Sequence, residues 1–131
     1  KGTLMSGAVP LALQHREIIK CKPKGKYLGN YKCHANSLSY ALRHPNVVAI
    51  VGVMQVFHDD TGVAHFIVKL DDDTYLDPTY GNLSEVLYKY CIIIEEYKVN
   101  TFKPNRELQN LKDYLCSLQP WYSKLFRRHP Y

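Results

Sequence analysis

The chain has 131 residues, of which 46% are hydrophobic, so a single domain over residues 1–131 with a sizeable core is expected and a disordered chain is excluded. The longest apolar run, residues 47–57, is too short to span a bilayer and includes Gln55, so no membrane partner is expected. The first residue is Lys1 rather than Met, which indicates a trimmed or partial chain.

The net charge is +5, and the basic excess lies towards the two ends. The residues concerned are Lys20, Lys22, Lys24, Lys26, Lys124, Arg127 and Arg128. Such ends either attract an acidic or phosphate-rich partner or form an ordinary solvated surface. The 11 tyrosines fit both readings, because aromatic side chains are typical of surfaces that bind protein or nucleic acid and tyrosines also lie at the edge of a core with the hydroxyl in water.

The four cysteines, Cys21, Cys33, Cys91 and Cys116, show no CxxC pair and no short metal-ligand spacing. Cys91 and Cys116 lie in apolar patterns typical of small buried hydrophobes. We therefore expect free thiols, a reducing cytoplasmic compartment and no cofactor, although the sequence also permits two disulfides. A zinc site is the chemical alternative, with its ligands drawn from Cys33, His34, His58, His65 and Asp77.

In chain order, residues 11–19 after Pro10 predict a short helix, and residues 21–32 predict a loop because they contain Pro and Gly. Residues 33–43 predict a helix with one apolar stripe at Ala35, Leu38 and Leu42. Pro45 ends it, since the residue before a proline disfavours helix. Cys33 then lies in the first turn, where free N–H groups and the helix dipole favour a thiolate.

The β-branched run 47–57 predicts a strand buried on both faces. Residues 63–70 predict the next strand, with Ala64, Phe66, Val68 and Leu70 on one face and His65 on the other. The acidic run 71–73 predicts a turn, and residues 74–77 a third strand that Pro78 ends.

Residues 83–90 have helical spacing with Ser84 as the cap, and residues 91–99 predict a strand. Asn105 is the expected cap of a last helix, in which Leu108, Leu111, Leu115 and Leu118 keep the helical period. Pro120 interrupts it, and residues 121–126 are expected to add a final turn. The predicted class is α+β, with the cysteine-bearing helix packed on a small antiparallel sheet.

Cys33, His65 and Asp77 form the candidate catalytic set, because a thiol, a base and an acid are the parts of a nucleophilic acyl-transfer site. Side chains alternate between the two faces of a strand. His65 and Asp77 therefore share a face of the hairpin only if the numbers of directly paired residues add up to an even number, which is called here an even register. A turn over residues 70–72 places them directly opposite each other, and a turn over residues 71–73 places them diagonally. Either register brings the carboxylate within reach of the imidazole.

The pattern of Cys33, His65-Phe66-Ile67-Val68 and Tyr75-Leu76-Asp77-Pro78-Thr79 resembles the transglutaminase-like branch of the papain-like superfamily, over about residues 28–82. The resemblance implies a Cys-His-Asp triad that acts through a thioester on a protein, peptide or amide substrate. Peptidases, deamidases, transamidases and amide hydrolases belong to that family. The chain differs in a shorter Cys-to-His spacing and in having Tyr31 and His34 near the cysteine where the family usually has Trp.

Three further residues are candidates for oxyanion or substrate binding. The Asn30 amide is expected to support the oxyanion beside the backbone N–H of Cys33, and Tyr31 flanks the nucleophile. Helical geometry predicts that His34 points away from Cys33, towards solvent or substrate. The alternative to an enzyme is a basic, tyrosine-rich module on the same or a degenerate fold, with binding that is sensitive to salt and indifferent to Cys33.

Overall fold

The computed structural model describes residues 9–118. Its strands are β1 (Ile18–Ile19), β2 (Val47–Val56), β3 (Gly62–Leu70), β4 (Tyr75–Leu76) and β5 (Tyr90–Tyr97). Its α-helices are α1 (Cys33–Arg43), α2 (Ser84–Leu87) and α3 (Pro104–Ser117), and its 3₁₀ turns are Leu11–Leu13, Gly81–Leu83 and Val99–Thr101. The predicted α+β class with an antiparallel sheet is confirmed.

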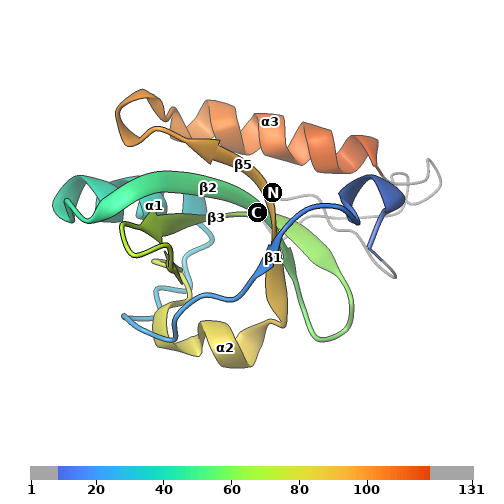
Figure 1. The fold of residues 1–131 in the computed structure, drawn as a ribbon, viewed down its shortest axis with the longest axis horizontal. Helices are drawn as coiled ribbons and strands as arrows, with labels where there is room; N and C mark the ends of the chain where they lie inside the picture. Colours follow the sequence, from blue (N-terminus) through green and yellow to red (C-terminus); the bar gives the residue numbers. More distant parts are fainter. Residues whose placement is uncertain (1–8, 119–131) are drawn as a thin grey trace.

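The five strands form one strongly curved sheet in the order β1-β5-β2-β3-β4, with antiparallel pairing throughout. The chain that leaves β1 then returns to the other edge of the sheet. There the N–H of Lys22 donates to the carbonyl of Tyr75 at 2.9 Å, and Lys22 forms a parallel bridge with Leu76. This contact nearly closes the sheet into a small barrel. Figure 1 shows β1 beside β5, with the blue chain that follows β1 running on towards α2.

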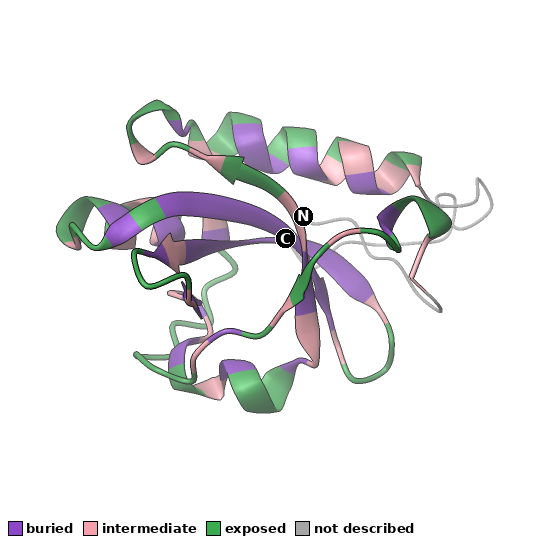
Figure 2. Ribbon diagram, in the orientation of Figure 1, coloured by how far each residue is buried: buried purple, intermediate pink, exposed green. Residues whose placement is uncertain are grey.

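The curved sheet separates two apolar clusters, so its central strands are buried on both faces. The inner cluster is made of Cys21, Val51, Val53, Ile67, Tyr75, Tyr88 and Cys91. The outer cluster lies under α1 and α3 and includes Ala64, Phe66, Val68 and Leu70 of β3, as predicted for that face. Figure 2 shows β2 and β3 buried over most of their length. The continuous apolar sequence of β2 follows from this double burial.

The outer edge of β3 is where α1 packs, and this contact positions the candidate site. β4 pairs only with Val68 and Lys69, so the first part of β3 has no neighbouring strand on that side. The hydroxyl of Ser37, on α1, donates to the free carbonyl of Phe66 at 3.1 Å. The N–H of Phe66 in turn donates to the Cys33 sulfur. The helix that carries the cysteine is therefore held to the strand edge by backbone groups of one residue.

This docking explains why the apolar stripe predicted for α1 was wrong. The buried positions are Cys33, Ser37 and Ala41, whereas Leu42 is 70% exposed and Ala35 is exposed. Small side chains four residues apart let the helix approach the strand edge closely. Leu38 is only partly buried against the outer cluster.

Other predicted elements differ at their bounds. The short helix expected over residues 11–19 is a single 3₁₀ turn followed by β1, and the helix expected over residues 83–90 is a 3₁₀ turn and α2, which ends at Leu87. Leu83 rather than Ser84 caps α2, and Tyr90 begins β5. The third strand is shorter than predicted.

At the C-terminal end, α3 keeps the predicted leucine period, but it begins with Pro104 after Lys103, so Asn105 lies inside its first turn and is not the cap. The turn expected over residues 121–126 lies outside the described residues. No helix within residues 9–118 combines the length and the apolar character that crossing a bilayer would require.

Candidate functional site

Three elements bring the candidate catalytic residues together. Cys33 is the first residue of α1, His65 lies in β3, and Asp77 directly follows β4. Val68 pairs with Leu76, and the N–H of Leu70 donates to the carbonyl of Thr74, so the turn is the one over residues 71–73. This register is even, so His65 and Asp77 lie on the same face of the hairpin.

In this register Asp77 lies diagonally across from His65, as predicted for that turn. The Nε2 of His65 donates to the Oδ2 of Asp77 at 2.8 Å, and both side chains are fully buried. The remaining ring nitrogen, Nδ1, is the one available to exchange a proton with Cys33.

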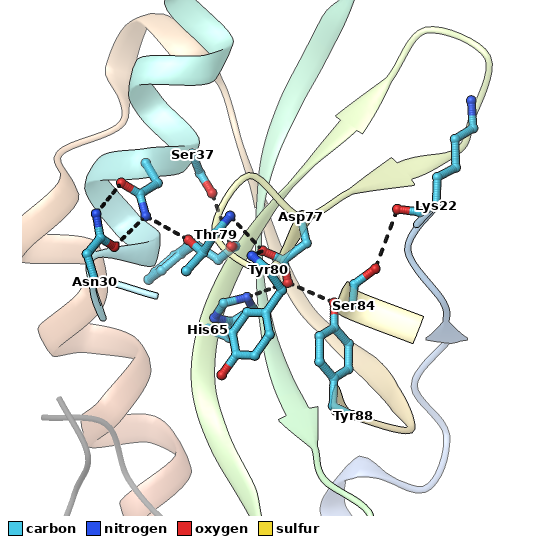
Figure 3. Close-up of polar contacts among 11 residues, drawn as sticks. Lys22, Asn30, Ser37, His65, Asp77, Thr79, Tyr80, Ser84 and Tyr88 are labelled. Carbon is cyan, nitrogen blue, oxygen red and sulfur yellow. Dashed lines mark hydrogen bonds and ion pairs between the residues drawn. The ribbon is translucent and has the colours of Figure 1, made fainter. Parts of the chain in front are cut away.

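Asp77 receives four hydrogen bonds, which Figure 3 shows converging on its carboxylate. The Oδ1 accepts from the backbone N–H groups of Thr79 at 2.9 Å and Tyr80 at 3.0 Å. The Oδ2 accepts from the Tyr88 hydroxyl at 2.7 Å in addition to His65. A carboxylate so fully bonded is fixed in position and fixes the histidine ring in turn.

The Cys33 thiol lies in surroundings that favour its ionised form. Burial by itself raises the pKa of Cys33, because it disfavours a charged sulfur. The charge of His65 and hydrogen bonds from His34 and His65 oppose burial, and so does the Phe66 N–H. The net result lowers the pKa of Cys33 from 9.0 to about 7. A substantial fraction of this thiol is therefore a thiolate at neutral pH.

The histidine and the acid are also shifted towards their charged forms. Burial lowers the pKa of His65, but the charges of Asp77 and Cys33 outweigh burial and raise that pKa well above its usual value. Burial raises the pKa of Asp77, and the charge of His65 with the hydrogen bonds described above lowers it overall. When Cys33 is ionised, the site is a thiolate, an imidazolium and a carboxylate of alternating charge inside an apolar core.

Two tyrosines surround this line on the inner side of the sheet. The Tyr80 ring meets His65 edge-on with centroids 5.4 Å apart, and Tyr88 lies 6.4 Å from His65 and 5.3 Å from Tyr80. Burial is the main cause that raises the pKa of both tyrosines, so both hydroxyls stay protonated. They exclude water from the His65–Asp77 pair, and Tyr88 also serves as a donor to it.

A second polar group ties the loop before Cys33 to the turn after Asp77. The Oδ1 of Asn30 accepts from the N–H of Lys32 at 3.1 Å and from the Asn36 amide at 2.8 Å, and the same Asn36 nitrogen donates to the Thr79 hydroxyl at 2.9 Å. Asn30 also donates to the Oδ1 of Asn36 at 3.3 Å. The amide of Asn30 that was predicted to support an oxyanion is thus used in holding the loop, with one N–H left over.

Tyr31 and His34 flank Cys33 in the sequence. Tyr31 is 60% exposed and has a φ of 56°, a left-handed conformation that a non-glycine residue adopts at a cost. His34 contributes a hydrogen bond to the Cys33 sulfur, so the prediction that it points away from Cys33 was wrong.

The four cysteines are all free, which agrees with the prediction of free thiols. Cys116 is half-buried rather than buried, and Cys21 is buried instead. Burial raises the pKa of Cys91 well above its usual value, and a hydrogen bond with Cys21 acts in the same direction. Of the two cysteines with shifted pKa values, only Cys33 is moved towards the thiolate.

Tyr88→Phe is expected to lower the free energy of unfolding by about 1–3 kcal/mol, because it removes a buried donor from Asp77 and leaves that oxygen with His65 alone. Urea unfolding followed by circular dichroism measures the change. Tyr90→Phe, in β5 and only half-buried, is the matched control and should change stability by less than about 0.5 kcal/mol. Equal effects of the two substitutions would show that the hydroxyl of Tyr88 contributes nothing specific.

Sequence reasoning missed Tyr88, Tyr80 and Asn36 as parts of this site. Tyr88 was assigned to a helix that ends before it, and its contact with Asp77 depends on how the chain returns from α2. Of the three, Asn36 could have been found from the sequence, because its position one helical turn after Cys33 places it near the same loop.

The described residues hold no group of three or more His, Cys, Asp or Glu side chains placed to bind a metal ion. In particular His58, one of the residues weighed for zinc, is bonded through its Nε2 to the carbonyl of Val86 at 3.0 Å. Comparison with protein-family models, with curated proteins and with solved structures finds no match to this chain.

Proposed function

We propose that this protein is a cysteine-dependent acyl-transfer enzyme with Cys33 as nucleophile, His65 as general base and acid, and Asp77 as the group that orients His65. The single observation that carries the proposal is the buried His65–Asp77 bond of 2.8 Å beside a cysteine whose pKa is lowered to about 7. A buried histidine with a purely structural role needs a hydrogen-bond partner such as Asp77. Such a role does not require a partly ionised thiol next to the other ring nitrogen.

In the proposed reaction the Cys33 sulfur attacks the carbonyl carbon of an amide-type substrate, and the carbonyl π electrons move to its oxygen. Free backbone N–H groups in the first turn of α1 stabilise that oxyanion. The oxyanion then re-forms the carbonyl, the C–N bond breaks, and His65 gives its proton to the leaving amine. A thioester on Cys33 remains.

Water or a second amine completes the reaction by attacking the thioester, with His65 taking the proton from the attacking group and returning Cys33 to its thiolate. Water gives hydrolysis or deamidation, and an amine gives transamidation. Cys33 is 1% exposed, so the substrate has to displace a covering side chain before its carbonyl reaches the sulfur.

The test is acylation by p-nitrophenyl acetate, followed by intact mass and peptide mapping. The wild-type chain is expected to carry an acetyl group on Cys33, and hydroxylamine is expected to remove it as the hydroxamate, which identifies a thioester. Cys33→Ala should lose the adduct, whereas Cys116→Ala, on the half-buried cysteine of α3, should keep it. An adduct that forms first on another cysteine, or equally in Cys33→Ala, would refute the proposal.

A further inference from the structure

A pocket of about 340 Å³ lies beside the candidate site, between the exposed side of α1 and the segment 24–28. Residues 76–78 also line it. Asn36 and Tyr40 line it from α1, and Asn36 also belongs to the hydrogen-bonded group next to Cys33. The pocket is of the size that holds small ligands and adjoins the triad without containing the nucleophile.

The pocket is lined by cations without acidic partners. Lys24, Lys26 and Arg43 all line it, and within residues 9–118 none of the three forms an ion pair. Arg43 donates from its Nε to the carbonyl of Ser39 at 3.2 Å, which orients the guanidinium and leaves its two terminal nitrogens free to bind a ligand. The three full charges outweigh the partial negative charge at the C-terminal end of α1.

The one acid among the described residues that line the pocket is Asp77, and its charge is not available there. Asp77 is fully buried, its two oxygens accept four hydrogen bonds, and the charged His65 neutralises it. Lys22, the neighbouring lysine on the same segment, is already paired with Asp72 at 3.2 Å. The pocket therefore presents a net positive charge to a ligand.

The wall that carries Lys24 and Lys26 is held in a fixed shape. The N–H of Asn82 donates to the carbonyl of Gly25, and the N–H of Leu28 to that of Thr79, each at 2.8 Å. Gly81 has a φ of 56°, and a Cβ there would lie 2.5 Å from the Gly25 carbonyl oxygen. Only glycine permits this approach, so the two loops form one rigid wall that needs little ordering when a ligand binds.

We propose that this pocket binds a multiply charged oxyanion, with phosphate or clustered carboxylate oxygens placed between Lys24, Lys26 and Arg43. This site is distinct from acyl transfer at Cys33 and does not depend on that reaction. Lysine supplies point charges and arginine supplies paired donors to two oxygens of the same group. Of the basic residues towards the N-terminal end, Lys24 and Lys26 thus take part in the proposed site. Lys124, Arg127 and Arg128 lie outside the described residues.

The proposal is tested by isothermal titration calorimetry of the full chain with sodium pyrophosphate and, separately, with trisodium citrate. Binding is expected to weaken about three- to fivefold in each of Lys24→Gln, Lys26→Gln and Arg43→Gln, and to be lost in the triple variant. Tighter binding of pyrophosphate identifies a phosphate ligand, and tighter binding of citrate identifies a carboxylate ligand. Both should weaken as salt is added.

Two further variants make the result specific to the pocket. Ser39→Glu places a negative charge on the α1 wall and should abolish binding, while Lys98→Gln, an exposed lysine outside the pocket, should leave it unchanged. Thermal unfolding of each variant shows that the fold is kept, since the substituted side chains are exposed. Absence of heat with both probes, or a triple variant that binds as tightly as the wild type, would overturn the proposal. Cys33→Ala should bind as the wild type does, so this test stands apart from the test of acyl transfer.

Discussion

His65→Gln is expected to raise the midpoint pH for alkylation of Cys33 from about 7 to its ordinary value near 9 or above, and to slow alkylation at neutral pH by at least about tenfold. Glutamine keeps a donor for Asp77 but cannot carry a positive charge. Burial, which raises the pKa of Cys33, then lacks its main opposing cause. The rate of iodoacetamide labelling at Cys33, followed by peptide mass spectrometry from about pH 5 to pH 10, measures the midpoint.

His15→Gln, on an exposed histidine near the N-terminal 3₁₀ turn, is the matched control and should leave the midpoint where it is. His34→Gln should give a smaller rise than His65→Gln, because His34 acts on Cys33 through a hydrogen bond whereas His65 also contributes its charge. In the wild type, Cys33 should be alkylated faster than Cys91, whose pKa is raised. An unchanged midpoint in a folded His65→Gln chain would remove the basis for assigning His65 as the base.

Asp77→Ala is expected to lower the free energy of unfolding by about 3–5 kcal/mol, the usual cost of removing one partner from a buried charged pair. The substitution leaves His65 charged or forced to lose its proton in an apolar core. It also deprives the N–H groups of Thr79 and Tyr80 and the Tyr88 hydroxyl of their acceptor. Urea unfolding at several pH values measures the loss.

The pH dependence of this loss has a defined sign. The pKa of Asp77 is lowered in the fold, so its contribution is present above the usual value of 3.8 and is lost as the pH falls through the folded pKa. The pKa of His65 is raised, so its contribution is present below about 6.5 and is lost as the pH rises through the folded pKa. The difference between wild type and Asp77→Ala should therefore be largest between about pH 4 and pH 6.5.

Asp71→Asn, on the exposed turn between β3 and β4, is the control for the acid and should change stability by less than about 0.5 kcal/mol. The loss of stability in Asp77→Asn should lie between those of Asp77→Ala and Asp71→Asn, because the amide oxygen can still accept hydrogen bonds while the charge is lost. A stability difference that keeps the same size down to about pH 2 would show that Asp77 acts through packing rather than through its charge.

The long central elements follow from the sequence because their local pattern leaves little choice. The β-branched run of β2 and the alternation of β3 define two strands, and Pro45 ends α1 at its observed bound. The acids of residues 71–73 predicted the turn, but the sequence left open whether the register would let His65 and Asp77 meet. The pairing of Val68 with Leu76 decides that they share a face. The order of Cys33, His65 and Asp77 as candidate nucleophile, base and acid could be read from the sequence before any contact was known.

Tertiary structure alone decided which edges meet and what surrounds the site. β1 has only two residues and joins the sheet through backbone hydrogen bonds, which nearly any sequence provides, so no side-chain pattern marks it. The buried face of α1 depends on the free edge of β3, to which Ser37 and Cys33 bond through Phe66. Tyr88 reaches Asp77 because the nearly closed barrel brings the segment after α2 back over the inner face. Hydrophobic periodicity predicts the secondary structure of one element, whereas these contacts depend on which other element packs against it.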